Sequence, residues 1–126
     1  MSFSNYLETE ILDFAFTTGT ATRPTAWYIA LYTAAPGEGG GGTEVSTGGY
    51  ARQSVTFSVS GNTASNTGAV EFPTATASYG TVTHVGVFDA SASGNLLAFS
   101  ALNTSKAIDT GDVFRIPTGD LDITLD

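Results

Sequence analysis

The 126-residue chain combines an ordinary hydrophobic share of 41% with only 13% charged residues, which is about half the usual charged fraction. Its twelve acidic and four basic residues give a net charge of −8, so we expect neither nucleic acid nor a membrane as a partner, because nucleic acids and anionic membranes attract clustered Lys and Arg. Cysteine is absent, which excludes disulfides and thiolate chemistry. The sequence shows no signal-peptide pattern and no apolar stretch of bilayer length, which predicts synthesis and folding in a cytoplasm.

The N-terminal region predicts the one helix of the chain, over residues 5–17. Leu7, Ile11 and Phe14 recur at helical spacing and form an apolar face. Most of the remaining positions are polar or acidic, and negative charge is favoured near a helix N-terminus. Two roles remain open for this helix. It packs across one end of a β-domain, or it is an arm that docks on a neighbouring subunit.

A strong strand follows over residues 26–34, with the sequence AWYIALYTA. Apolar side chains alternate onto both of its faces, which indicates a strand buried on two sides. Its aromatic residues, Trp27 above all, could stack on a ligand. We interpret them as core residues, because aromatic side chains dominate β-cores and no Lys or Arg alternates with them here.

Residues 35–49 form the one low-complexity segment and hold seven glycines. This composition predicts a mobile loop rather than a strand. The segment lacks the spacing of a phosphate-binding loop, and Glu38 and Glu44 would repel an anion. We therefore expect an exposed loop that becomes ordered against a partner.

The next run, over residues 50–59, alternates in the manner of a half-buried strand. The predicted inward positions are Ala51, Val55, Phe57 and Val59, and the predicted outward positions are Arg52, Ser54, Thr56 and Ser58. Residues 63–68 are polar and predict an edge strand or a loop.

The segment from Glu71 to Leu102 predicts the central hairpin of the sheet. Two runs, over 81–88 and 96–102, carry apolar groups on both faces, and the connection over 89–95 is rich in Asp, Ser, Gly and Asn. Residues 103–110 are predicted to be a polar link. A short strand over 113–116 and a last strand over 121–125 complete the pattern.

These elements predict an all-β fold, in which one antiparallel β-sandwich of seven or eight strands, Ig-like or jelly-roll-like, spans residues 1–126 as a single domain with one N-terminal helix. The sequence leaves the strand order open.

Catalytic and metal-binding patterns are weak. His84 is the one histidine, and no GxSxG nucleophile elbow is present, so we predict that the protein is not an enzyme. Calcium binding by Asp109, Asp112, Asp120 and Asp122 is a minor alternative, because acidic turn residues mostly satisfy local backbone N–H groups. We expect no cofactor.

Five segments, in order over nearly the whole chain, carry a resemblance. They are SNYLETEILDFAF, WYIALYTAAP, GGTEVSTGGYARQSVTF, FPTATASYGTVTHVGVFDA with GNLLAF, and GDLDIT. The most specific are the run from Gly49 to Arg52 before an alternating strand, and the segment from Phe72 to Asp89. Together they resemble a family of small structural proteins of tailed bacteriophages, labelled as capsid decoration or tail-fibre-like proteins. The resemblance implies a non-enzymatic virion component and brings no catalytic or metal residues.

Our leading hypothesis is a capsid decoration (cement) protein that binds and stabilises the assembled head. It would lie on the outer capsid surface after synthesis in the host cytoplasm, with the major capsid protein and copies of itself as partners. A homotrimer is the favoured assembly, because such proteins usually lie at local symmetry axes. The alternative is a tail, collar or fibre-associated protein that binds host-surface carbohydrate through an exposed Trp27 or Tyr79.

The expected interface has three parts, namely the Gly-rich loop, the strand that follows it and the apolar face of the helix. A low-charge surface suits this role, because few ionised groups must lose their water when it is buried. The residues expected to make contact are Gly40, Gly41, Glu44, Tyr50, Arg52, Leu7 and Ile11.

Overall fold

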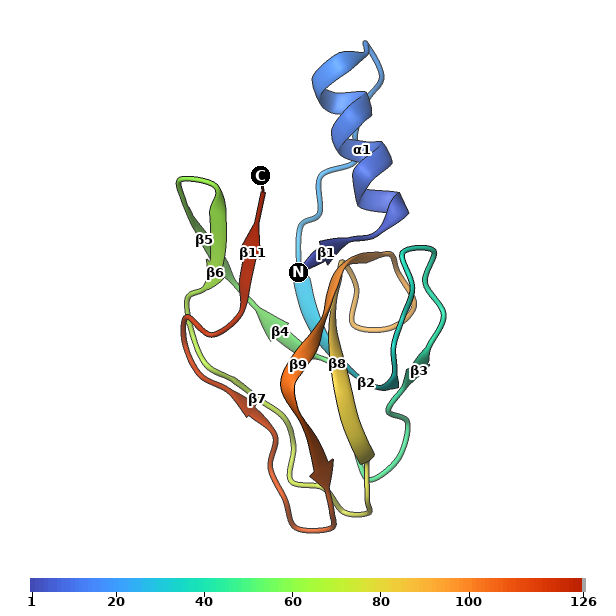
Figure 1. The fold of residues 1–126 in the computed structure, drawn as a ribbon, viewed down its shortest axis with the longest axis vertical. Helices are drawn as coiled ribbons and strands as arrows, with labels where there is room; N and C mark the ends of the chain where they lie inside the picture. The colour runs from blue at the N-terminus through green and yellow to red at the C-terminus, as the bar shows by residue number, and fades with distance from the viewer. Residues whose placement is uncertain (126) are drawn as a thin grey trace.

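The computed structural model describes residues 1–125, which form one helix and eleven strands (Figure 1). Strands account for 43% of the chain and the helix for 10%, so the predicted all-β class with an N-terminal helix is confirmed. The elements are β1 (Ser2–Phe3), α1 (Asn5–Phe16), β2 (Trp27–Ala34), β3 (Thr43–Glu44), β4 (Gln53–Val55), β5 (Phe57–Ser60), β6 (Thr63–Asn66), β7 (Val70–Glu71), β8 (Gly80–Phe88), β9 (Leu96–Ile108), β10 (Arg115–Ile116) and β11 (Asp122–Thr124).

The largest sheet is antiparallel and has the order β1-β9-β8-β2, with β3 and β4 both paired to the far edge of β2. The predicted central hairpin is confirmed as β8 and β9, joined by residues 89–95. Two further antiparallel ladders, β10-β7 and β11-β6-β5, lie beside this sheet. The arrangement is sandwich-like, with more strands than the seven or eight predicted, several of them only two residues long.

Both faces of the large sheet are covered around β2 and the adjoining ends of β8 and β9, as the two-sided pattern of β2 predicted. One face carries the main core, in which Ile29, Leu31 and Val87 pack against side chains such as Phe72 and Phe114. The other face carries a smaller buried cluster, consisting of Ala30, Tyr32, Phe88 and Leu96. A strand buried on both sides needs apolar residues at every position, which explains the unbroken run in β2.

The predicted strand over 50–59 is wrong in one respect, because it divides at Thr56 into β4 and β5, which belong to different sheets. At the crossing, Thr67 donates its backbone N–H to the Thr56 carbonyl at 3.0 Å. The predicted alternation holds from Ser54 to Ser58, where Val55 is buried, Phe57 is half-buried and the residues between and beside them are exposed, but it fails at both ends of the run. Ala51 and Val59, expected inside, are exposed, whereas the Arg52 side chain, expected outside, is 8% exposed.

Three polar segments also differ from expectation. Residues 63–66 form β6, the middle strand of its ladder rather than an edge or a loop. The predicted link over 103–110 is wrong as far as Ile108, because β9 continues through it opposite Gly80–Val82. The Gly-rich segment contains β3 and the buried Val45, so it is not free of strand. Backbone pairing satisfies N–H and C=O groups whatever the side chains are, which lets polar sequences form strands.

Helix α1 begins at a Ser4 cap, whose hydroxyl accepts the Leu7 N–H at 3.2 Å and donates to the Leu96 carbonyl. From this anchored base the helix projects beyond the sheets (Figure 1). Leu7 packs on the core, but Phe14 is 76% and Phe16 is 80% exposed. Packing of the whole helix across the sandwich is therefore wrong, and its outer half is a protruding arm. Within residues 1–125 no helix is long and apolar enough to cross a membrane.

Candidate functional site

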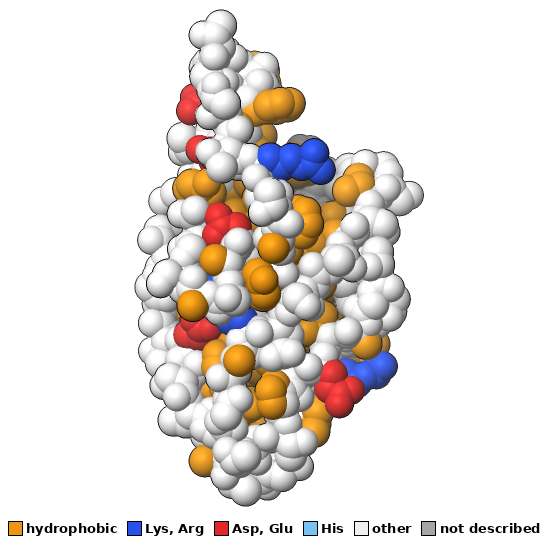
Figure 2. Space-filling model, turned by 180° about the vertical axis from the view of Figure 1, so that it is seen from behind, with side chains coloured by type: hydrophobic (Ala, Val, Ile, Leu, Met, Phe, Trp, Pro, Cys, Tyr) orange, Lys and Arg blue, Asp and Glu red, His pale blue; other side chains and the backbone are white. Residues whose placement is uncertain are grey.

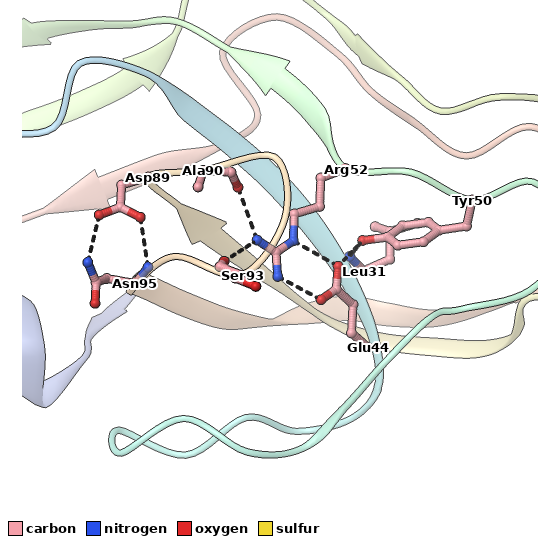
Figure 3. Close-up of polar contacts among 8 residues, drawn as sticks. All are labelled: Leu31, Glu44, Tyr50, Arg52, Asp89, Ala90, Ser93 and Asn95. Atoms are coloured by element: carbon pink, nitrogen blue, oxygen red, sulfur yellow. Dashed lines mark hydrogen bonds and ion pairs between the residues drawn. The ribbon is translucent and has the colours of Figure 1, made fainter.

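The most organised polar group in the molecule joins the Gly-rich segment to the strand after it (Figure 3). Arg52 donates from Nε to Glu44 Oε2 at 2.9 Å and from Nη2 to Glu44 Oε1 at 2.8 Å. Tyr50 donates its hydroxyl to the same carboxylate at 2.7 Å and accepts the Leu31 N–H at 3.1 Å. The two parallel bonds form the bidentate geometry that Arg makes best with a carboxylate.

The same guanidinium reaches the connection of the central hairpin. Its Nη1 donates to the carbonyls of Ala90, at 3.0 Å, and Ser93, at 2.8 Å. Its centre lies 3.6 Å from the ring centroid of Phe88, a cation–π contact. Asp89 shapes the connection further by accepting the backbone and side-chain N–H groups of Asn95 (Figure 3). Arg52 therefore ties three segments into one cluster, which we call the Arg52 clamp (Glu44, Tyr50, Arg52 and the carbonyls of Ala90 and Ser93).

Burial and charge act in opposite directions on the ionisable groups of the clamp. Burial alone would raise the pKa of Glu44, but the hydrogen bonds from Arg52 and Tyr50 outweigh it and hold that pKa below its usual value. Burial and the neighbouring carboxylate raise the pKa of Tyr50 well above its usual value. The clamp is therefore an ion pair with a neutral phenol at neutral pH.

The predicted interface residues fall into three places. Glu44, Tyr50 and Arg52 come together, but they satisfy one another within the chain. Gly40 and Gly41 lie in the loop with positive φ values of 90° and 89° and open space where a Cβ would be. Leu7 and Ile11 are half-buried on α1, and for all seven residues the interface role stays a prediction. The carbonyl partners in the hairpin connection were missed, although its Ser- and Gly-rich sequence signalled a tightly turned loop.

The residues considered for chemistry have local partners. His84 Nδ1 lies 2.8 Å from the hydroxyl of Thr83. Asp112 accepts the Asp109 N–H at 2.9 Å, and Asp122 accepts the hydroxyl of Ser65. Among residues 1–125, no three His, Cys, Asp or Glu side chains gather as a metal site would require.

The two aromatic residues considered for sugar stacking differ in exposure. Tyr79 is 4% exposed and donates its hydroxyl to the Pro73 carbonyl at 3.0 Å, so its ring is not available to a ligand. Trp27, expected to be buried, is only half-buried and lines an open groove of about 580 Å³.

A family model described as "Podophage GP4 fiber I protein gp80" matches residues 2–124. The chain belongs to this family. Membership of the fiber I family confirms the resemblance to structural proteins of tailed phages, and it indicates a structural component of the virion. No curated protein matches the chain.

Proposed function

We propose that this chain is a fibre-associated structural subunit of a tailed-phage virion. The observation that carries the proposal is the family match over residues 2–124, whose description names a fibre protein. This choice favours the tail, collar or fibre alternative over the leading hypothesis of capsid decoration.

The architecture supports a role as a rigid building block. The Arg52 clamp holds the hairpin connection and the Gly-rich segment against the large sheet, so the body offers a preformed surface. With 13% charged residues, that surface gives up few hydrated charges when a neighbour covers it. A protruding helix adds a contact element that can reach beyond the body.

Capsid decoration remains the second candidate, because residues 1–125 show a short body and no shaft-like repeat. A decoration protein would bind the major capsid protein and, as a homotrimer, occupy local symmetry axes. A fibre-associated protein would instead be limited to the few positions where fibres attach.

Copy number and position on purified virions distinguish these two roles. Quantitative mass spectrometry, with the major capsid protein as the internal standard, is expected to give on the order of ten copies per particle, since tail symmetry is low. Gold-labelled antibody is expected to mark the tail or its fibres in negative-stain images. On the order of hundreds of copies, with label over the whole head, would overturn the fibre assignment in favour of decoration.

Absence from purified virions would overturn both roles. A glycan array run on the purified protein and on Trp27→Ala tests the associated idea of host-surface carbohydrate binding. Binding that depends on Trp27 would support that idea.

A further inference from the structure

An open apolar groove separates the large sheet from the β11-β6-β5 ladder. Its volume is about 580 Å³. Trp27 and Leu97 come from the large sheet, Phe57 and Ile123 come from the small ladder, and Leu7 comes from the base of α1. Among its described lining residues, Arg23 is the one charged side chain, and it is exposed. The sandwich is therefore incompletely closed at the end from which the helix projects.

The helix arm has apolar side chains on opposite faces. Phe14 continues the stripe of Leu7, whereas Leu12 and Phe16, four residues apart, share a face on the other side. Leu12 is 57% exposed, Phe14 76% and Phe16 80%. Figure 2 shows apolar side chains exposed both on the protruding helix and on the body below it. A helix that is apolar on opposite faces is typical of one that is buried in an assembly.

We propose that helix α1 of a second copy of this chain occupies the groove. The arm and the groove match in polarity and in charge. The helix carries Glu8, Glu10 and Asp13 and no basic residue, and the groove carries Arg23 alone. Because unlike charges steer and orient association, this distribution favours the acidic helix over a basic or neutral one.

The helix cannot fill the groove of its own chain. Its base is fixed, because Ser4 bonds to the Leu97 and Leu96 carbonyls and the Asn5 N–H donates to the Glu38 carbonyl at 2.9 Å. Farther along, Glu10 accepts the Thr22 N–H at 2.6 Å. These contacts hold the arm pointing away from the body, while its base, at Leu7, forms part of the groove wall.

The length and apolar area of helix α1 are compatible with such a contact between two copies. A 12-residue helix is about 18 Å long. The three exposed side chains of the arm offer roughly 400 Å² of apolar area, given about 200 Å² for a phenylalanine. The groove walls expose less than half of that area, so a reciprocal pair with two such contacts buries roughly 1,200 Å² in total, at the lower end of the range for specific interfaces.

Arm and groove are different surfaces of one chain, so copies can close as a reciprocal pair or as a ring in which each arm enters the next groove. The expected trimer would be such a ring. The contact is the same in both arrangements and does not depend on where the protein lies in the virion.

Sedimentation of the purified protein over a concentration series tests the contact first. We expect reversible assembly into dimers or trimers. The double variant Phe14→Asp, Phe16→Asp is expected to raise the dissociation constant at least about 100-fold, because two central apolar anchors are lost. The matched control is Val113→Asp, which alters a 43% exposed side chain outside the groove and is expected to change the constant less than about threefold. Circular dichroism checks that each variant is folded.

The contribution of the groove to the contact is tested by reversing the charge of Arg23. Arg23→Glu is expected to weaken assembly about tenfold at low salt and less at high salt, because the contact is screened. Lys106→Glu reverses an exposed charge away from the groove and is its control.

Crosslinking gives the direct test, because the chain has no cysteine of its own. A tagged Phe14→Cys chain mixed with an untagged Ala64→Cys chain is expected to form a disulfide between copies, since Ala64 lines the groove. A Val113→Cys chain in place of the Ala64→Cys chain is expected to form none.

A protein that stays monomeric at every concentration would overturn the proposal. The proposal would also be overturned if the Phe14→Asp, Phe16→Asp variant assembled as well as the wild type, or if Phe14→Cys formed a disulfide only with Val113→Cys.

Discussion

Replacing Arg52 by Ala should produce a large loss of stability. The change removes both bonds to Glu44, at 2.8 and 2.9 Å, and the bonds to the carbonyls of Ala90 and Ser93. It also removes the cation from the ring of Phe88. Glu44 is left with one hydroxyl partner beside apolar surface.

The size of the loss follows from burial. Removing one partner of a buried ion pair costs about 3–5 kcal/mol. The Glu44 side chain is 28% exposed, so water can partly resolvate it, and we expect the lower end, about 3 kcal/mol at neutral pH. For a domain of this size that corresponds to a drop in Tm of roughly 10 °C.

Urea unfolding, followed by the fluorescence of Trp27, measures the free energy of unfolding of wild type and variant. Arg115→Ala is the matched control, because its contact with Glu71 is 3.9 Å long and both side chains are more than half exposed. Such a pair contributes less than about 1 kcal/mol. If Arg52→Ala costs no more than Arg115→Ala, the clamp does not stabilise the fold and the reasoning fails.

Acid provides a second test of the same substitution. In the wild type the pKa of Glu44 lies below its usual 4.5, so the stabilisation is present above that value and is lost as the pH falls through the folded pKa. In the variant the bonds from Arg52 are gone while burial remains, which raises that pKa. The difference in stability between the two proteins should therefore shrink below about pH 4.5.

Four further changes have clear expected outcomes. Tyr50→Phe should lower the free energy of unfolding in urea by about 1–2 kcal/mol. Because the pKa of Tyr50 is raised from its usual 10.0, the stability of the wild type should also fall more steeply than that of the variant above pH 10. Asn66→Ala, which loses three hydrogen bonds of a 2% exposed side chain, should cost about 3 kcal/mol by thermal melting. Gly48→Ala places a Cβ 2.2 Å from a backbone carbonyl oxygen and should destabilise more than Gly61→Ala, where a φ of 60° is the main penalty of about 1 kcal/mol. Deleting Gly39–Gly42 should leave the fold intact, and in the intact loop amide exchange should slow only when the protein is assembled.

Apolar patterning predicted the parts of the fold that depend on burial alone. The predicted strand over 26–34 and the central hairpin were found because β2 and the paired ends of β8 and β9 are buried on both faces, which needs apolar residues at every position. The helix at Asn5–Phe16 followed from periodicity, but its direction did not. Leu7 and Phe14 lie on the same face of the helix. Leu7 packs against the core, whereas Phe14 lies beyond the end of the sheet and is exposed to solvent.

The features that were not predicted from the sequence depend on contacts between residues that are distant in the chain. Asn66 is buried because its side chain bonds to the Pro117 carbonyl and the Leu121 N–H, which no local pattern contains. Arg52 alternates as an outward residue, but the 89–95 connection folds over it and supplies two carbonyls. The clamp could be predicted only as three polar residues near one another in the sequence, because its inward direction is set by tertiary contacts.

The pairing of β1 with β9 has a consequence for how the chain reaches this structure. Ser2 lies opposite Phe99, and β11 pairs with β6 from the other end of the sequence. During synthesis the N-terminal residues must therefore wait until most of the chain has left the ribosome before they find their place. Folding with such distant contacts is slow, since long loops must close before the contacts stabilise them. Until then the apolar strand β2 is exposed as well, and transiently exposed apolar surface makes a partly folded chain prone to aggregation.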